Sequence, residues 1–487
     1  MVMRRELNLL WAFIGMLLFG CGSNPATENT EIPPPNIIYI LADDLGYGDL
    51  GCYGQEKFTT PHLDQLAGEG IRFTRHYSGS TVCAPSRSVL MTGLHTGHTY
   101  IRGNQEVRPE GQWPLTASAV TLAEMLKEAG YVTGAFGKWG LGFPGSEGDP
   151  VNQGFDRFFG YNCQRYAHRY YPEYLWENEE KFYLEGNDWS STTTYAPDVI
   201  QQKTLDFIRE NKDTSFFAYV PIVIPHAELI APEDDIFRDL LGKYPEVPYV
   251  GRPGADYGPD MVIGMYCSQE NPHATFAAMV RRIDLYVGQI VEILEEEGIA
   301  ENTIIMFTSD NGPHQEGGAD PGFFNSSGDL RGVKRDLYEG GIRVPFIVSW
   351  PGVVEAGRTS DHISAFWDVL PTVADLVEFQ LDNTDGISFL PELLGKEQPG
   401  HELLYWEFHG RGGKQAILKD EWKAVRLNVG KDPHGPLELY NLTDDPLEKE
   451  NVAAAHPDLV DQFSRMMDEE RVPSEKFNFG MPTYSGE

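Results

Sequence analysis

The sequence predicts an α/β fold in which helices sandwich a large, mostly parallel sheet, followed by a small C-terminal antiparallel sheet and a helix. Short apolar runs rich in β-branched residues alternate with helical segments from residue 36 onward. This alternation is typical of a parallel sheet covered on both faces. From about Gly400 the chain changes to short runs separated by turns, which favours antiparallel pairing. We therefore expect a main domain at 36–398 and an α+β subdomain at 399–487.

The first strand, 36–41 (NIIYIL), stops just before Asp43 and Asp44. Thr121 and Glu124 form a capping-box pattern that begins a helix over 121–129. The other elements predicted for the main domain are strand 131–136, helix 199–208, strand 215–220, a helix ending at 298 and strand 303–307. Ligands gather at the carboxyl ends of parallel strands, so we expect the polar residues there to form one site. The alternative is that these polar residues only mark where the strands leave the sheet into solvent. That would explain polar residues after one strand well, but it explains them less well after four.

Three short runs and a helix make up the predicted C-terminal subdomain. The runs are 402–407, 415–418 and 422–427, and the helix spans 457–470. Gly-rich or charged turns separate the runs, as in a meander of antiparallel strands.

The N-terminus has the pattern of an export signal. Arg4 and Arg5 precede an apolar run at 9–19, which is too short to span a membrane comfortably. The run ends in LFGC, which resembles the lipobox of bacterial lipoproteins. This resemblance implies a signal peptide at 1–20, lipidation of Cys21 and a tether at 21–35; the alternative is an uncleaved signal. The expected location is a periplasm-facing membrane or the cell surface, with membrane attachment through the lipid anchor only.

Charge and cysteine content narrow the function classes. The 487 residues carry a formal net charge of −35, which argues against binding to nucleic acid. An anionic substrate must therefore be met by a local cluster of cations. With Cys21 and Cys83 set aside, three of the five cysteines remain, an odd number that cannot form a disulfide framework.

The segment CAPSRSVLMTG, which begins at Cys83, carries the clearest chemical pattern. Pro85 suits the first turn of a helix, so Cys83 would lie at the helix N-terminus, where negative charge is favoured. Arg87, one turn later, would lie on the same face. The spacing indicates an activated group beside a cation, although a buried apolar cysteine is the simpler alternative.

This segment resembles the signature of type I sulfatases, the formylglycine-dependent, arylsulfatase-like branch of the alkaline phosphatase superfamily. In that family the cysteine is oxidised to formylglycine (3-oxoalanine). The resemblance extends in order through most of the chain after the tether, in the segments LADD (41–44), GYVTGAFGKWG (130–140), SDNG (309–312), GVKRDLYEGGIRVP (332–345), DGISFLP (385–391) and ELYNLTDDPLE (438–448). It implies a bacterial carbohydrate sulfatase and, as a partner, a formylglycine-generating or anaerobic sulfatase-maturating enzyme.

The resemblance also implies roles for individual residues. Calcium would be bound by Asp43, Asp44, Asp310, Asn311 and the modified Cys83, a set of oxygen ligands that suits a hard cation. The sulfate would be held by the cations Arg87, Lys138 and Lys334, and His226 would contact or protonate the leaving oxygen. The aldehyde hydrate derived from Cys83 would supply the nucleophile.

The sequence departs from the family at Gly140, where many members have a histidine that is thought to help the hydrate collapse. His314 is our first candidate for a replacement base and His168 our second; either could instead be an ordinary loop histidine. His95 and His98 are expected to be structural or to line the sugar pocket.

Residues for substrate binding are predicted from less specific patterns. The candidates are Arg102, Asn104, Arg165, His168, Tyr170, Tyr171, Glu407, His409 and Gln415, which would hold a sugar or simply pack an interface. The predicted function is removal of sulfate from glycans. The alternatives are a phosphonate or phosphate ester hydrolase and an inactive glycan-binding lipoprotein.

Overall fold

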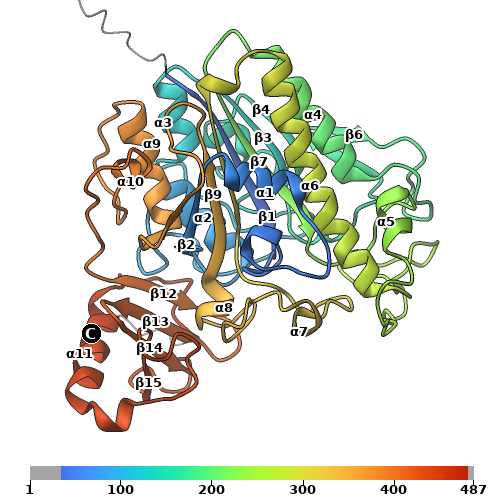
Figure 1. The fold of residues 1–487 in the computed structure, drawn as a ribbon. Coiled ribbons are helices and arrows are strands. Elements are labelled where there is room, and N and C mark those ends of the chain that lie inside the picture. The colour runs from blue at the N-terminus through green and yellow to red at the C-terminus, as the bar shows by residue number, and fades with distance from the viewer. Residues whose placement is uncertain (1–33, 481–487) are drawn as a thin grey trace, which may run out of the picture. The chain divides into compact units, whose positions relative to one another are not determined.

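The computed structural model describes residues 34–480 and confirms the predicted fold class (Figure 1). The predicted signal peptide, Cys21 and most of the tether lie outside the described residues. The large sheet consists of β1 (Asn36–Asp43), β2 (Ile71–Tyr77), β3 (Val132–Lys138), β4 (Arg157–Tyr161), β5 (Tyr174–Glu177), β6 (Glu180–Tyr183), β7 (Phe216–Pro225), β8 (Thr303–Ser309), β9 (Arg343–Ser349), β10 (Arg358–Ser360) and β11 (Ser364–Ala365).

The strand order is β10-β2-β9-β8-β1-β7-β3-β4-β5-β6, and β11 pairs with β2. The central strands β8, β1, β7, β3 and β4 run parallel to one another, whereas β9, β5 and β6 pair antiparallel with their neighbours. The sheet is thus mixed and mostly parallel at its centre, with β1 between β7 and β8. All residues of β1 are buried, as expected for a strand covered on both faces.

Helices cover both faces of the sheet. The helices of the main domain are α1 (Pro61–Gly68), α2 (Cys83–Thr92), α3 (Leu122–Glu128), α4 (Ala196–Glu210), α5 (Asp235–Leu240), α6 (Pro272–Glu296), α7 (Pro321–Phe324), α8 (Glu339–Ile342), α9 (Val369–Leu376) and α10 (Leu390–Leu393). The helices α2, α3 and α9 pack together in one apolar core, and α1, α4 and α6 in another. Side chains of β1 alternate between these two cores: Ile37 and Tyr39 face the first, and Ile38 and Ile40 the second.

The predicted capping box is present at the start of α3. The Thr121 hydroxyl accepts from Glu124 N at 3.2 Å, and the Glu124 carboxylate accepts from Thr121 N at 2.9 Å. Two backbone donors at the helix start are thereby satisfied.

The small sheet has the order β12 (Leu404–Phe408), β13 (Lys414–Lys419), β14 (Trp422–Leu427) and β15 (Leu437–Asn441), all antiparallel. The fourth strand, β15, was not predicted. Helix α11 (Pro457–Glu469) packs Phe463 and Met467 against this sheet. None of the helices in the described part of the chain is long and apolar enough to cross a membrane.

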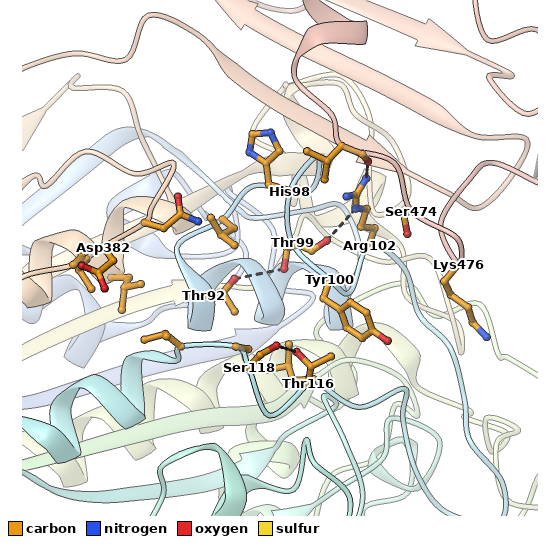
Figure 2. A pocket seen from close by; sticks show the side chains of 18 of the residues that line it. Thr92, His98, Thr99, Tyr100, Arg102, Thr116, Ser118, Asp382, Ser474 and Lys476 are labelled. Carbon is orange, nitrogen blue, oxygen red and sulfur yellow. Dashed lines mark hydrogen bonds between the residues drawn. The ribbon is translucent and has the colours of Figure 1, made fainter. Parts of the chain in front are cut away.

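A cavity of about 1280 Å³ lies at the C-terminal end of α2 (Figure 2). It is lined by Thr92, Tyr100 and Arg102, among others, and by residues 472–476. Cys83 begins α2, so this cavity and the catalytic candidates lie at opposite ends of the same helix.

Candidate active site

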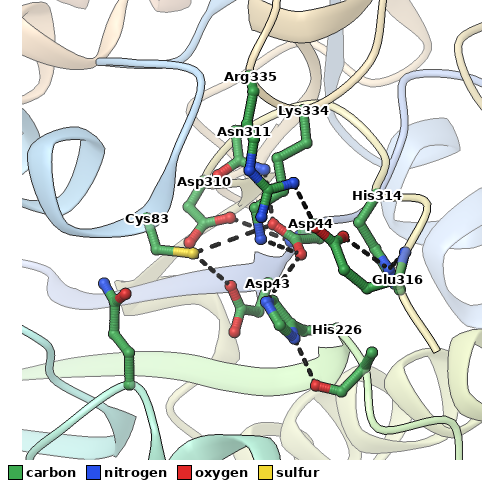
Figure 3. Close-up of polar contacts among 12 residues, drawn as sticks. Asp43, Asp44, Cys83, His226, Asp310, Asn311, His314, Glu316, Lys334 and Arg335 are labelled. Atoms are coloured by element: carbon green, nitrogen blue, oxygen red, sulfur yellow. Dashed lines mark hydrogen bonds and ion pairs between the residues drawn. The ribbon is translucent and has the colours of Figure 1, made fainter. Parts of the chain in front are cut away.

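The carboxyl ends of four neighbouring strands bring the predicted site together. Asp43 ends β1, Lys138 ends β3, His226 follows β7 and Asp310 follows β8. Parallel pairing of β1 with β7 and with β8 places these strand ends side by side. The expectation that separate segments meet at one edge of the sheet is confirmed (Figure 3).

Cys83 is the first residue of α2 and is buried. Its Sγ lies 3.3 Å from Asp43 Oδ1 and 3.3 Å from Lys138 Nζ. Burial, and then the charge of Asp43, hold the pKa of the thiol well above its usual value. A thiol with a raised pKa makes a poor nucleophile at neutral pH, so the geometry does not favour Cys83 acting as a thiolate.

Four groups around Cys83 have the chemistry of a cation site. Ligand atoms of Asp43, Asp44, Asp310 and Cys83 all lie within 4.8 Å of one another. Asn311 Nδ2 donates to Asp44 Oδ1 at 2.7 Å, while Asn311 Oδ1 is buried without a hydrogen-bond partner among the described residues. A buried carbonyl oxygen needs a partner, and oxygen donors of this kind suit a hard cation such as Ca²⁺. The residues therefore fit the predicted metal.

Three buried cations face these carboxylates. Arg87 Nη2 lies 2.8 Å from Asp310 Oδ2, Lys138 Nζ 2.6 Å from Asp43 Oδ2, and Lys334 Nζ 2.6 Å from Asp44 Oδ2. Burial alone would lower the pKa values of both lysines, but the neighbouring carboxylates raise them. Both lysines therefore carry their charge inside the site.

His226 is held by its neighbours with one nitrogen directed at the carboxylates. Its Nδ1 lies 2.5 Å from the Ala227 carbonyl oxygen, and its Nε2 lies 3.2 Å from Asp44 Oδ2. Burial, followed by the charge of Lys334, keeps the pKa of His226 well below its usual value. His168 stacks on its ring at 4.5 Å.

Both ring nitrogens of His314 have hydrogen-bond partners. Its Nε2 donates to the Pro225 carbonyl oxygen at 2.9 Å, and its Nδ1 accepts from Glu316 N at 3.2 Å. The ring also stacks on His226 at 5.5 Å. Nδ1 also lies 3.4 Å from Glu316 Oε2. These contacts favour a role for His314 in orienting His226, and its role as the replacement base stays a prediction.

The space beside Gly140 is filled by Gln164, which was not predicted. Gly140 has φ of 78°, and a Cβ added there would lie 3.4 Å from Gln164 Nε2. Gln164 Nε2 in turn donates to Asn104 Oδ1 at 3.4 Å, and the same oxygen accepts from Ala84 N at 3.0 Å. The glutamine therefore lies where a side chain at position 140 would point.

The predicted substrate-binding residues separate into two groups. Asn104 lies next to the residue that follows Cys83, and the partly exposed His168 stacks on His226. Arg165, also partly exposed, pairs with Glu106 near this site. The second group lies elsewhere: Arg102, Glu407, His409 and Gln415 belong to a network within and beside the small sheet.

Glu407 is fully buried, and both of its oxygens are used. Oε1 accepts from Arg102 Nη1 and His409 Nε2, and Oε2 accepts from Arg471 Nε and Tyr405 OH. Arg102, Glu407 and His409 thus hydrogen bond to one another, and a role for them in sugar binding stays a prediction. These contacts favour the alternative that the three residues pack an interface.

Two further predicted sugar residues have structural contacts. Tyr170 is buried and donates its hydroxyl to the His226 carbonyl oxygen at 2.5 Å. Tyr171 packs against Tyr195 and Tyr257. Neither contact favours a role in sugar binding.

His95 and His98 form a cluster with Asp385, and the contacts indicate a structural role. The two rings stack at 4.3 Å, and His98 Nδ1 lies 2.9 Å from Asp385 Oδ1. His95 Nδ1 accepts from Gly97 N at 3.1 Å, so the proton of the neutral ring lies on Nε2. That nitrogen faces Asp385 at 3.7 Å as a donor rather than as a metal ligand.

Comparison with known families agrees with this geometry. Residues 35–379 match the family model for sulfatases, and residues 332–472 match the model for the C-terminal region of N-sulphoglucosamine sulphohydrolase. The chain belongs to the sulfatase family. As a sulfatase it is a sulfuric ester hydrolase, and this match favours sulfate ester hydrolysis over the phosphate and binding-only alternatives.

Relatives of this sulfatase cover most of its length. The N-acetylgalactosamine-6-O-sulfatase of Bacteroides thetaiotaomicron is 29% identical, with 93% of this chain and 96% of the relative covered. Human arylsulfatase A is 32% identical, with 89% and 87% covered. A structure from work on the metabolism of multiple glycosaminoglycans by B. thetaiotaomicron has a TM-score of 0.71 and 29% identity, covering 89% of this chain and 98% of that one.

Proposed function

We propose that this sulfatase removes sulfate from glycans, using a formylglycine made from Cys83 and a Ca²⁺ ion. The observation that carries the proposal is the convergence on one buried point of Cys83, three carboxylates and three cations. The raised pKa of the Cys83 thiol supports its role as a precursor rather than as the reacting group. Once Cys83 is converted, the hydrate of the aldehyde would supply the attacking hydroxyl.

Asp43, Asp44, Asp310 and Asn311 would hold the Ca²⁺ ion. Bound there, the ion would offset the carboxylate charges and favour deprotonation of the nucleophile. Asn311 Oδ1, buried and unpartnered among the described residues, would then gain a partner.

Arg87, Lys138 and Lys334 would bind the sulfate. The charge of the transition state lies on the nonbridging and leaving oxygens, and fixed cations in a pocket without water stabilise such charge better than water does. Their fixed positions come from α2, from β3 and from the segment before α8. His226, oriented by Ala227 and His314, would direct Nε2 at the leaving oxygen.

The first candidate substrate is an N-acetylgalactosamine 6-sulfate unit. This candidate is supported by the name of the bacterial relative that is covered almost completely. We also propose lipidation at Cys21, export, and maturation by a formylglycine-generating or anaerobic sulfatase-maturating enzyme.

The test compares the matured enzyme on aryl sulfate, aryl phosphate and N-acetylgalactosamine 6-sulfate, with and without EGTA. We expect both sulfates to be hydrolysed at least roughly tenfold faster than the phosphate. A tenfold difference in rate corresponds to about 1.4 kcal/mol in activation free energy. EGTA should abolish hydrolysis and added Ca²⁺ should restore it. A preference for phosphate would contradict the proposal, as would full activity after chelation.

A further inference from the structure

Glu316 and Arg335 lie at the edge of the active site and were not predicted from the sequence. Figure 3 shows both beside Lys334 and His314. A carboxylate oxygen of Glu316 lies within 4.8 Å of both an Asp44 oxygen and a His314 nitrogen. The Arg335 guanidinium forms an ion pair with Glu316, and the two side chains are 27% and 17% exposed. The pair therefore touches both the catalytic centre and solvent.

The backbone of Arg335 is fixed in an unusual conformation. Its φ is 78°, a region that costs free energy for any residue with a Cβ. Arg335 N donates to the hydroxyl and to the carbonyl oxygen of Thr81, at 2.8 and 3.0 Å, and Arg335 O accepts from Lys414 Nζ at 2.7 Å. Contacts on both sides of the residue hold this conformation, so the guanidinium is placed in advance of any ligand.

Two partly exposed rings lie next to the pair. His168 stacks on His226 and contacts Tyr266, with 5.4 Å between the ring centroids of His168 and Tyr266. Gly317 follows Glu316 in the chain and lies beside Tyr266, since a Cβ added at Gly317 would lie 3.7 Å from Tyr266 Cβ. The two rings are therefore close to Glu316. The edge of the site thus combines ring surfaces with a few fixed polar groups, which is the usual composition of a small-molecule site.

The opposite charges of Glu316 and Arg335 determine which sugar can bind beside them. Every hydroxyl both donates and accepts, whereas guanidinium only donates and carboxylate only accepts. A fixed donor beside a fixed acceptor therefore complements two neighbouring hydroxyls. An unpaired Arg335 would attract a second anionic group, but Glu316 cancels its charge and repels such a group.

We propose that Glu316 and Arg335 bind two neighbouring hydroxyls of the sugar ring that carries the sulfate. This subsite would select a monosulfated neutral sugar and reject a ring with a second sulfate or a carboxylate. The inference rests on the proposed function, since it requires hydrolysis of a sugar sulfate at this centre.

The test measures kcat/KM of the matured wild-type enzyme on three substrates: N-acetylgalactosamine 6-sulfate, its 4,6-disulfate and an aryl sulfate. We expect the monosulfated sugar to exceed the disulfate by roughly tenfold or more, since one repelled or unpaired charged group has an effect of this size. Equal rates on the two sugars would overturn the inference. Failure to hydrolyse any of the three would instead refute the proposed function.

Two variants sharpen this test. Glu316→Gln should lower kcat/KM for the monosulfated sugar about ten- to hundredfold and reduce the preference over the disulfate to less than about threefold. Arg335→Gln should lower turnover of the sugar more than turnover of the aryl sulfate, which has no hydroxyls to bind. Equal losses on both substrates would indicate a merely structural role and contradict the inference.

Arg157→Gln is the matched control. Arg157 also pairs with a glutamate, Glu210, and is 26% exposed, but it lies at the start of β4. We expect this control to keep the wild-type ratio between the three substrates. Should Arg335→Gln fail to fold, Arg335→Lys and the wild-type comparison of the two sugars still decide the question.

Discussion

Two buried clusters of carboxylates and cations can be compared in this protein: the active site and the network around Glu407. In the network, one carboxylate is surrounded by Arg102, His409 and Arg471, and each of its oxygens has two donors. In the active site, three carboxylates crowd together around Cys83 and a buried amide oxygen is left without a partner among the described residues.

This difference distinguishes a cluster that supports the fold from a cluster that serves catalysis. Each active-site carboxylate already pairs with a buried cation. The Asn311 oxygen, which is buried without a partner among the described residues, is the group that calls for a further positive ligand. The same residue types therefore serve different purposes, and hydrogen-bond satisfaction tells the two clusters apart. Two substitutions test this distinction, and a third tests a buried carboxylate outside both clusters; they are given from the largest expected effect to the smallest.

The largest effect is expected at Cys83. Relative to matured wild-type enzyme, Cys83→Ala should reduce hydrolysis of aryl sulfate by at least about 10⁴-fold, because it removes the source of the nucleophile. Thermal unfolding should change little, since the active site is not built for stability. The partly exposed Cys52 offers the control Cys52→Ala, which should keep wild-type turnover. Retained hydrolysis in Cys83→Ala would refute the formylglycine mechanism.

The next effect is on stability and lies in the Glu407 network. Glu407→Gln should lower the free energy of unfolding by about 3 kcal/mol, because it removes the buried negative charge that Arg102 and Arg471 face. Denaturant unfolding measures this loss, and kcat/KM of the folded enzyme should stay within about twofold of wild type.

Glu210→Gln removes an exposed partner of Arg157 and should cost less than about 1 kcal/mol. A loss of activity in Glu407→Gln without a loss of stability would reverse the assignment of Glu407 to the interface.

The smallest effect concerns Asp49, a buried carboxylate for which no ion pair is recorded among the described residues. Burial raises the pKa of Asp49 to about 7, above an unfolded value of about 3.9. As the pH rises between these values, the unfolded chain releases the proton while the folded chain keeps it, so stability falls. Between about pH 5 and about pH 6.5 this loss should reach roughly 2 kcal/mol.

Asp49→Asn should lack this loss, so the variant should gain stability relative to wild type as the pH rises. Urea unfolding at several pH values measures the difference. Asp213→Asn, at an exposed position, should show a difference that does not change with pH. If the stability difference between Asp49→Asn and wild type stays constant over this pH range, burial does not raise the pKa of Asp49 as expected.

The sequence predicted the parts of the molecule that depend on local pattern. The apolar runs of β1, β7 and β8 and the capping box of α3 were predicted, and the polar residues that follow these strands meet as expected. The strand β2 was missed because charged residues interrupt its apolar pattern (IRFTRHY). The pattern of β2 is therefore that of a half-buried strand, which short-range periodicity detects weakly.

Contacts between distant segments account for the site features that the sequence did not predict. Arg102 and Glu407 are 305 residues apart and meet only because the small sheet packs beside the loop after α2. The filling of the space at Gly140 by Gln164 depends on how two loops pack. In the sequence, Arg335 directly follows Lys334 and Glu316 comes two residues after His314. This closeness to motif residues was the signal that could have pointed to them.

Lys414 links the small sheet to the edge of the active site. It begins β13 of the small sheet, yet its Nζ donates to the Arg335 carbonyl oxygen and to Asp336. The residues that would face the sugar are thus held in place from the small sheet. Exchanging the small sheet between relatives is therefore expected to alter substrate choice as well as stability, and a chimaera must keep Lys414 together with Arg335 and Asp336, which it supports.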